Sequence, residues 1–385
     1  MTETDERKLI LIVDDAPANL QIVRSILKDD FKIRVATSGA KALDLVKAKP
    51  QPDLILLDVT MPEMDGYEVC GILKATPEAR DIPVIFLTGK TETDDETKGF
   101  EVGAVDYIHK PFSPAVVKAR VHTHLVLREV QKQLARKLLD INNELEMARE
   151  IQLSILPHEI PKIRGLEIAA RYIPMSSVAG DFYDFIVVDE KHIGIFIADV
   201  SGHGLPAAII ASMLKVALTA QSPHAFDPAR VLAGLNQSLC GKFKQHFVTA
   251  AYVFVDMEKN SIGYAGAGHP PLLLWRTSRG NSSEVLQNGL ILGLFPEATY
   301  SVVEVLVEPG DKIVLYTDGI LETRSPSEQE FGVDLFKAFL ESNHSLGADT
   351  FADSLLDELS NWSEHPRGNG QEDDITLLAI DFQGA

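Results

Sequence analysis

The chain has 385 residues, of which 45% are hydrophobic and 24% are charged, so it can form more than one hydrophobic core. Its formal net charge of −20 repels phosphate backbones, which argues against a nucleic-acid partner. The two cysteines, Cys70 and Cys240, fit neither a zinc motif nor a disulfide framework. No apolar run approaches the ~18 residues of a membrane span, so we expect a cytoplasmic protein without a membrane partner.

Short apolar runs alternate with segments of helical spacing through the first third of the chain. The runs expected as strands are Leu9–Val13, Ile33–Ala36, Leu54–Leu57, Val84–Leu87 and Val105–Ile108. This alternation predicts an α/β domain with a parallel sheet and helices on both faces. Ligand sites on such sheets lie at the carboxyl ends of the strands.

Polar residues stand where these strands end, and they are Asp14, Asp15, Asp58, Thr88 and Lys110. Three carboxylates close together are tolerated when a hard divalent cation, typically Mg²⁺, binds among them. A lysine and a threonine hydroxyl nearby can bind a phosphoryl group, so the set suits phosphoryl transfer to a carboxylate. Acidic residues also end strands in ordinary α/β proteins, but three aspartates, a threonine and a lysine at successive strand ends favour the functional interpretation.

Three segments resemble the receiver domains of bacterial response regulators: residues 57–66 (LDVTMPEMDG), residues 12–15 (IVDD) and residues 109–112 (HKPF). The resemblance covers about residues 7–122 and implies a flavodoxin-like (βα)5 fold with Asp58 as the phosphoacceptor. It also implies a cis Lys110–Pro111 bond and a cognate sensor histidine kinase as partner.

The same resemblance assigns the remaining receiver residues. The Mg²⁺ ligands would be Asp14, Asp15, Asp58 and the carbonyl of Thr60. Thr88 and Lys110 would bind the phosphoryl group, and Tyr107 would be the aromatic switch residue.

The segment from Val121 to Leu156 contains no Gly or Pro and is rich in good helix formers, so it predicts one long helix that Pro157 stops. Apolar residues recur in steps of three and four, with Gln152 in the same register, at Leu134, Leu138, Ile141, Leu145, Ala148 and Ile155. This heptad seam favours a parallel dimeric coiled coil. The alternative is a single helix packed on its own domain.

From about Leu166 onward, most apolar runs follow one another without crossover helices, which predicts an α+β domain with antiparallel sheets. The expected strands are Ile168–Ile173, Phe182–Val188, Ile193–Asp199, Val248–Asp256, Ile262–Ala265, Leu272–Trp275, Lys312–Thr317 and Ile375–Ile380. The expected helices are Pro206–Thr219, Pro228–Phe243, Val333–Ser342 and Thr350–Trp362.

Acidic residues again stand at strand ends, in the segments 179–184 (AGDFYD), 198–204 (ADVSGHG), 316–319 (YTDG) and 372–376 (EDDIT). Asp beside Gly lets the backbone approach an ion, so a carbonyl can also be a ligand. These oxygen ligands favour Mg²⁺ or Mn²⁺ over zinc or copper. Two such ions lower the pKa of a shared water, which suits direct hydrolysis of a phosphomonoester. Surface turns could explain one Asp-Gly pair, but not all four segments in this order.

These four segments resemble the type-2C metal-dependent phosphatases, and in particular the SpoIIE and RsbU phosphatases of partner-switching pathways. The segments 148–152 (AREIQ), 267–271 (AGHPP) and 292–294 (LGL) are also similar, so the resemblance covers about residues 145–383. It implies a β-sandwich flanked by helices and two Mn²⁺ or Mg²⁺ ions.

The resemblance assigns the phosphatase residues as follows. Asp199 would bridge both ions, the Val200 carbonyl would bind one of them, Asp181 would hold the second, and Asp318 and Asp373 would hold the first. Asp374 is an alternative to Asp373. Ala179 departs from the second Gly that the family usually has. His203 could be a general acid, a helix cap or purely structural, and His269 is expected to be structural.

We therefore interpret the chain as a receiver domain (1–122), a helical coiled-coil linker (123–160) and a type-2C phosphatase domain (161–385). The predicted function is a homodimeric response regulator in which Asp58 phosphorylation controls a serine/threonine phosphatase, with activation favoured over inhibition. The resemblance implies a phosphorylated anti-sigma-factor antagonist of the STAS type as substrate. One alternative is an inactive scaffold that binds a partner, but every metal carboxylate is present. A cyclic-dinucleotide synthase is disfavoured, because residues 180–182 (GDF) lack part of its Gly-Gly-Asp/Glu-Glu-Phe run.

Overall fold

The computed structural model describes residues 7–89, 99–243, 246–367 and 371–383. It divides into two compact units, residues 1–140 and residues 141–385, and each is described by itself. In the described residues, no helix is both long and apolar enough to span a membrane.

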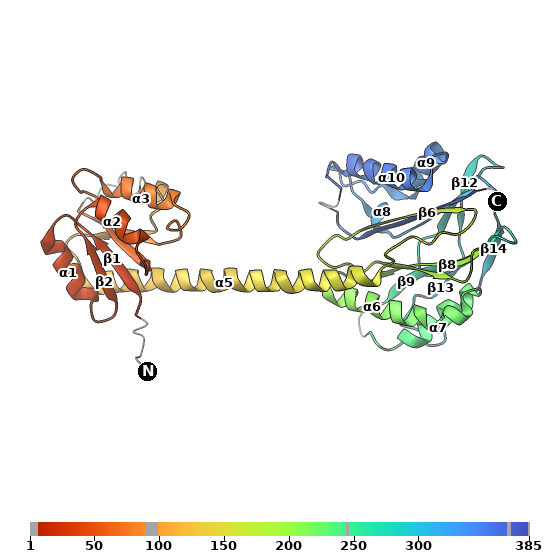
Figure 1. Cartoon of the computed structure of the whole chain (residues 1–385), viewed down its shortest axis with the longest axis horizontal. Helices are drawn as coiled ribbons and strands as arrows, with labels where there is room; N and C mark the ends of the chain where they lie inside the picture. Colours follow the sequence, from red (N-terminus) through yellow and green to blue (C-terminus); the bar gives the residue numbers. More distant parts are fainter. Residues whose placement is uncertain (1–6, 90–98, 244–245, 368–370, 384–385) are drawn as a thin grey trace. The chain divides into compact units, whose positions relative to one another are not determined.

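The N-terminal unit contains a five-stranded parallel sheet in the order β2-β1-β3-β4-β5 (Figure 1). Its strands are β1 (Leu9–Val13), β2 (Lys32–Ala36), β3 (Leu54–Asp58), β4 (Val84–Thr88) and β5 (Asp106–His109). Its described helices are α1 (Pro17–Leu27), α2 (Gly39–Lys47), α3 (Gly66–Ala75) and α5 (Pro114–Ile155), the last of which continues into the second unit. The sheet confirms the predicted flavodoxin-like α/β fold.

Helices cover both faces of this sheet because its strands are apolar throughout. Ile10 and Ile12 pack in one core with α1 and the first turns of α5. Leu11 and Val13 pack in the other core with α2 and α3. Alternate residues of one strand therefore pack in opposite cores, as expected for a strand that is buried on both faces of the sheet.

The C-terminal unit contains two sheets. The first has the order β13-β10-β9-β8-β7, with β14 also paired to β10, and the second has the order β12-β11-β15-β16-β6. The strands are β6 (Leu166–Ile173), β7 (Phe182–Val187), β8 (His192–Val200), β9 (Val248–Asp256), β10 (Ser261–Ala267), β11 (Leu272–Arg276), β12 (Asn281–Val285), β13 (Asn288–Gly289), β14 (Val303–Leu306), β15 (Lys312–Tyr316) and β16 (Ile375–Phe382). Apart from the short parallel pairing of β10 with β13, the pairings are antiparallel, as predicted.

Helices lie on the outer faces of the two sheets (Figure 1). They are α6 (Leu205–Thr219), α7 (Pro228–Leu239), α8 (Gly319–Glu322), α9 (Gly332–Asn343) and α10 (Ala348–Ser363). In β15, Ile313 and Leu315 belong to the core shared with the first sheet, whereas Val314 and Tyr316 pack with α9 and α10. This alternation confirms the predicted β-sandwich flanked by helices.

Three features differ from the sequence prediction. The helix expected to reach Phe243 ends at Leu239, because Gly241 follows in the left-handed region with φ of 74°. The strands β12, β13 and β14 and the four-residue helix α8 were not predicted. The strand β12 has the polar sequence NSSEV, which lacks the apolar alternation of a half-buried strand.

The long helix α5 ends at Ile155, just ahead of Pro157 as predicted. Several residues of the predicted seam are exposed in the single chain, with Leu134 at 58%, Leu138 at 53% and Ile141 at 52%. Gln152 is different, because it is 5% exposed and belongs to the buried part of the C-terminal unit. The end of α5 is therefore packed on its own domain, and the coiled coil stays a prediction for the middle of the helix.

Candidate functional site

The strand ends of the N-terminal unit bring the predicted carboxylates together. Asp14 and Asp15 follow β1, Asp58 ends β3, and ligand atoms of these three side chains all lie within 4.8 Å of one another. Lys110 follows β5 and places Nζ 3.0 Å from Oδ2 of Asp14 and 3.0 Å from Oδ1 of Asp58. These side chains lie close together because β1, β3 and β5 are parallel, so their carboxyl ends lie at the same edge of the sheet.

The protonation of this cluster depends on burial and on the lysine. Burial raises the pKa of Asp58, Lys110 lowers it, and the charges of Asp14 and Asp15 raise it further. Burial alone would lower the pKa of Lys110, but its hydrogen bonds to Asp14 and Asp58 outweigh burial and leave the pKa raised. Lys110 is therefore held as a cation against Asp58.

Backbone geometry holds this cluster in place. Asp14 accepts hydrogen bonds from the backbone N–H of Ala16 at 2.9 Å and from the side-chain amide of Asn19 at 3.0 Å. A Cβ at Gly66 would lie 2.2 Å from the carbonyl oxygen of Asp58, so only glycine allows α3 to begin against the end of β3. The Lys110–Pro111 bond is cis, as predicted.

The other predicted receiver residues stand near the same edge. Thr88 ends β4 and is 5% exposed, whereas Thr60 is exposed in the loop after β3. Tyr107 is buried in β5, with its ring 5.6 Å from the ring of Phe86 and 5.2 Å from that of Phe100. A Cβ at Gly99 would lie 1.6 Å from the Tyr107 hydroxyl oxygen, so this position of the tyrosine depends on Gly99.

The acidic segments of the C-terminal unit also meet at one end of the sandwich. Burial, followed by the nearby charges of Asp318, Asp373, Asp374 and Glu322, raises the pKa of Asp199 to about 8. Burial and then the charge of Asp373 raise the pKa of Asp318. Glu322, at the end of α8, is a member of this cluster that the sequence did not suggest.

Asp181 is the most buried of these carboxylates, at 2% exposure. Burial, followed by the charge of Asp199, raises its pKa well above the ordinary range. Its Oδ2 accepts hydrogen bonds from the hydroxyls of Thr317 at 2.7 Å and Thr376 at 2.6 Å. Because both donors use the same oxygen, they fix the orientation of the carboxylate. These threonines lie beside the predicted Asp318 and Asp374, but nothing in the sequence marked them as partners of Asp181.

The neighbours Asp373 and Asp374 have different surroundings. Asp374 is 5% exposed, and its two oxygens accept hydrogen bonds from the backbone N–H groups of Met175 at 2.7 Å and Gly180 at 2.6 Å. Asp373 is less buried and accepts from the backbone N–H of Asp374 at 2.8 Å. The Asp374 carboxylate therefore ties the segment before β16 to both ends of the loop between β6 and β7, while Asp373 is closer to solvent.

Two glycines allow the loops of this site to approach. A Cβ at Gly180 would lie 2.8 Å from the carbonyl oxygen of Val200, and one at Gly319 would lie 2.1 Å from the carbonyl oxygen of Asp374. The first contact packs the Asp181 loop against the end of β8. The second brings the Asp318 turn against the segment before β16, so the Asp-Gly pairs of the sequence have a steric cause here.

The carboxylates of the C-terminal unit are spaced more widely than those of the receiver. Across residues 7–89, 99–243, 246–367 and 371–383, the receiver trio is the only group of three His, Cys, Asp or Glu side chains whose ligand atoms all lie within 4.8 Å. The ion pairs among these described residues include none to Asp181, Asp199, Asp318 or Asp373. Their negative charge therefore has no cationic side chain paired with it in the described part of the chain.

The two histidines of the predicted motifs differ in burial. His269 is 2% exposed, burial lowers its pKa to about 3, and its Nδ1 lies 3.0 Å from the hydroxyl of Thr249, in keeping with a structural role. His203 is exposed, and the N-cap of α6 is Gly204, without a side-chain capping hydrogen bond. The structure thus offers no capping role for His203.

Comparisons with known proteins agree with this division of the chain. The model of the family "Stage II sporulation protein E (SpoIIE)" matches residues 189–383, and that of the response regulator receiver domain matches residues 10–122. The chain is 30% identical over 258 residues to the phosphoserine phosphatase RsbU of Bacillus subtilis, which covers 67% of this chain and 73% of RsbU. The chain belongs to the SpoIIE family. Its SpoIIE domain follows a receiver domain.

Other relatives share one part of the chain. A stretch of 137 residues is 48% identical to a probable cyclic di-GMP phosphodiesterase of Vibrio cholerae serotype O1, covering 36% of this chain but only 30% of that protein. The solved structure of the SiaA-PP2C domain of Pseudomonas aeruginosa matches with a TM-score of 0.57 at 24% identity, covering 65% of this chain and 100% of that domain. This structural match shows that the SpoIIE domain has the PP2C fold.

Proposed function

We propose that this protein is a response regulator, phosphorylated on Asp58, that controls a Mg²⁺- or Mn²⁺-dependent protein serine/threonine phosphatase. The observation that carries the proposal is the cluster of fully or partly buried carboxylates in the SpoIIE domain, which form no ion pair among the described residues. Its members raise one another's pKa, and Asp199 reaches about 8. Such a concentration of negative charge costs stability unless cations balance it, and hard divalent ions are the cations that oxygen ligands select.

The proposed ligand set consists of Asp181, Asp199, Asp318, Asp373 and the carbonyl of Val200. Bound there, two divalent ions would supply Lewis acidity and lower the pKa of a shared water, so that a phosphomonoester is hydrolysed at neutral pH. Thr317 and Thr376 would orient Asp181, since both donate to its Oδ2. We assign Asp373 as the ligand and Asp374 as the residue that holds the loops, because both oxygens of Asp374 already accept backbone hydrogen bonds.

In the receiver, the cluster of Asp14, Asp15 and Asp58 suits one Mg²⁺, with the Thr60 carbonyl as a further proposed ligand. Lys110 would neutralise the phosphoryl group on Asp58, from which its Nζ is 3.0 Å away. We assign Thr88 to the phosphoryl oxygens and Tyr107 to the switch between two receiver states. The phosphoryl donor would be a sensor histidine kinase.

We propose that phosphorylation activates the phosphatase through α5, acting in a homodimer whose helices pair along the exposed Leu134, Leu138 and Ile141. The domains proposed are the receiver at 1–122, the linker at 123–160 and the phosphatase at 161–385. The likeness to the phosphoserine phosphatase RsbU supports a phosphoprotein substrate, for which we propose an anti-sigma-factor antagonist of the STAS type.

Phosphate release from a phosphoserine peptide tests the enzymatic part of this proposal. The wild type should release phosphate with Mn²⁺ and not after chelation. Asp199→Asn should lower the rate at least about 100-fold, because it removes the proposed bridging ligand. Asp334→Asn, which changes an exposed residue of α9 in the same way, should leave the rate unchanged. Equal rates for Asp199→Asn and the wild type would contradict the proposal.

A further inference from the structure

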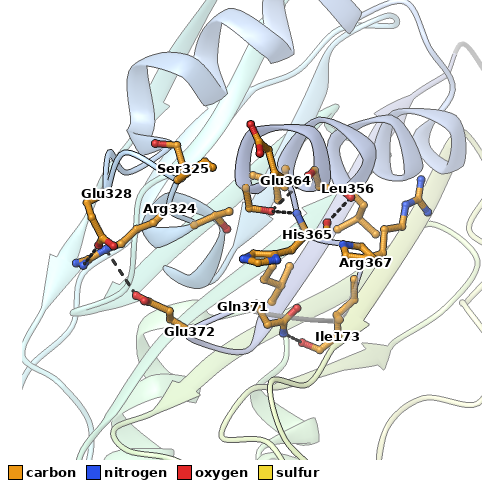
Figure 2. Close-up of a pocket in the computed structure, with 17 residues that line it drawn as sticks. Ile173, Arg324, Ser325, Glu328, Leu356, Glu364, His365, Arg367, Gln371 and Glu372 are labelled. Atoms are coloured by element: carbon orange, nitrogen blue, oxygen red, sulfur yellow. Dashed lines mark hydrogen bonds and ion pairs between the residues drawn. The ribbon is translucent and has the colours of Figure 1, made fainter.

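The SpoIIE domain contains a cavity of about 330 Å³, and Figure 2 shows the residues that line it. Its walls come from the end of β6, the loop after α8, the end of α10 and residues 371–372. The aliphatic side chains among its lining residues are Ile173, Leu356, Leu359 and Ile375. Polar and charged side chains, including those of Ser363, Glu364 and Glu372, line most of the rest.

Two walls of this cavity continue directly into the carboxylate loops. Thr323 follows Glu322 of α8, and Glu372 precedes Asp373. The side-chain amide of Gln371 donates to the carbonyl of Ile173 at 2.9 Å and to that of Asp373 at 3.0 Å. The wall of the cavity is thus hydrogen-bonded to the backbone of a proposed metal ligand, so the residues that flank a bound phosphoserine are the part of a substrate to consider as its occupant.

The charges around the cavity argue against an anionic ligand. Arg324 pairs with Glu328 at 3.3 Å and with Glu372 at 3.6 Å, as Figure 2 shows. Arg367 has its own partners, Asp353 and Asp357. Both arginines that line the cavity therefore already have carboxylate partners. The apolar part of its lining comes from Ile173, Leu356, Leu359 and Ile375. The volume is at the small end of the range for ligand pockets, which suits one or two side chains.

We infer that this cavity binds an aliphatic side chain of the phosphoprotein substrate, from the segment that flanks the phosphorylated residue. The inference rests on the proposed function, because it makes the cavity a specificity pocket of the same active site. Burying a Leu side chain contributes about 1.5–3 kcal/mol, which corresponds to roughly 10- to 100-fold in affinity.

The test measures binding of fluorescent phosphoserine peptides to the full chain by anisotropy. The peptides differ only in whether Leu or Ser stands at one position, and the position is moved from two to six residues on either side of the phosphoserine. At one or two positions, Leu should bind at least about 10-fold more tightly than Ser. Equal affinities at every position would overturn the inference.

Two variants locate the preference in the cavity. Ser363→Phe should fill the cavity from α10, and His365→Phe should narrow it from an exposed position where folding is not at risk. Either substitution should reduce the ratio of Leu to Ser affinity to about one, whereas Ser278→Phe, in the exposed turn after β11, should keep the ratio of the wild type. A ratio that survives in a folded Ser363→Phe or His365→Phe protein would overturn the inference.

Hydrolysis of p-nitrophenyl phosphate by the wild type, with and without Mn²⁺, separates this inference from the proposed function. A hydrolytic enzyme without a Leu preference would refute only the pocket. Failure to hydrolyse both p-nitrophenyl phosphate and phosphopeptides would refute the proposed phosphatase activity. The ratio of Leu to Ser peptide affinity would still decide whether the cavity binds an aliphatic side chain.

Discussion

Gln152 near the end of α5 makes the most specific contact between the linker helix and the loop of Asp181. Its amide donates from Nε2 to the carbonyl oxygen of Ala179 at 2.6 Å and accepts at Oε1 from the N–H of Ala179 at 3.0 Å. Ala179 is fully buried, so no water can replace these bonds. Only Asn and Gln side chains can both donate and accept in this way through one amide.

We predict that Gln152→Leu lowers the free energy of unfolding of the SpoIIE domain by about 1–4 kcal/mol. Each buried peptide group that loses its partner costs about 1–3 kcal/mol, which gives about 2–6 kcal/mol for the N–H and the C=O of Ala179. Burial of the leucine offsets about 1–2 kcal/mol of this loss. Because Asp181 lies two residues beyond Ala179, we also expect weaker Mn²⁺ binding in calorimetric titrations.

Tryptophan fluorescence during urea unfolding measures this loss in the full chain. The two tryptophans, Trp275 and Trp362, both belong to the C-terminal unit, so their emission follows that unit alone. Gln133→Leu is the matched control, because Gln133 is an exposed residue of the same helix. The control should change stability by less than about 0.5 kcal/mol. A Gln152→Leu protein as stable as the control would refute the reasoning.

Three further predictions concern the carboxylates and the linker. When a chelator removes metal ions, Asp199 with its pKa of about 8 keeps a proton in the folded protein, whereas the unfolded chain releases that proton near pH 4. The free energy of unfolding should therefore fall as the pH rises from 6 to 8, by at most about 2.7 kcal/mol. Asp199→Asn should flatten this slope in thermal melts, and an unchanged slope would contradict the assignment. Asp373→Asn should weaken Mn²⁺ binding with little change in Tm. Asp374→Asn should lower the free energy of unfolding by about 1–3 kcal/mol, because two buried N–H donors lose a charged acceptor. The reverse pattern would mean that Asp374 is the metal ligand and Asp373 the structural residue. Replacing Leu134 and Leu138 together by Asp should convert a dimer into a monomer in analytical ultracentrifugation, and a wild type that is already monomeric at micromolar concentration would exclude the coiled coil.

The sequence predicts the fold well where local pattern and burial agree. The strand Val248–Asp256 was predicted with its observed bounds, because its apolar residues are buried on both faces of the sheet. The polar strand β12 was missed, since it lies at a sheet edge where pairing with β11 rather than its own side chains defines it. Edge strands depend on tertiary contacts, which a window of sequence does not contain.

The candidate site was predictable to the extent that its residues follow strands. The carboxylates of the receiver could be grouped because parallel strands end at a common edge, and they lie within 4.8 Å of one another. The hydrogen bonds of Thr317 and Thr376 to Asp181 join residues 136 and 195 positions apart, so no spacing rule could reveal them. The heptad register assigned Gln152 to the linker seam, but its burial against Ala179 gives it a different partner.

The most direct test of the account is the rate of p-nitrophenyl phosphate hydrolysis with Mn²⁺, with and without beryllofluoride, which mimics a phosphoryl group on Asp58. The wild type should hydrolyse the substrate faster when beryllofluoride is added, because the receiver then adopts its phosphorylated state. Asp58→Asn should keep the basal rate and lose the response. A phosphatase that is active but has the same rate with and without beryllofluoride would contradict control by the receiver.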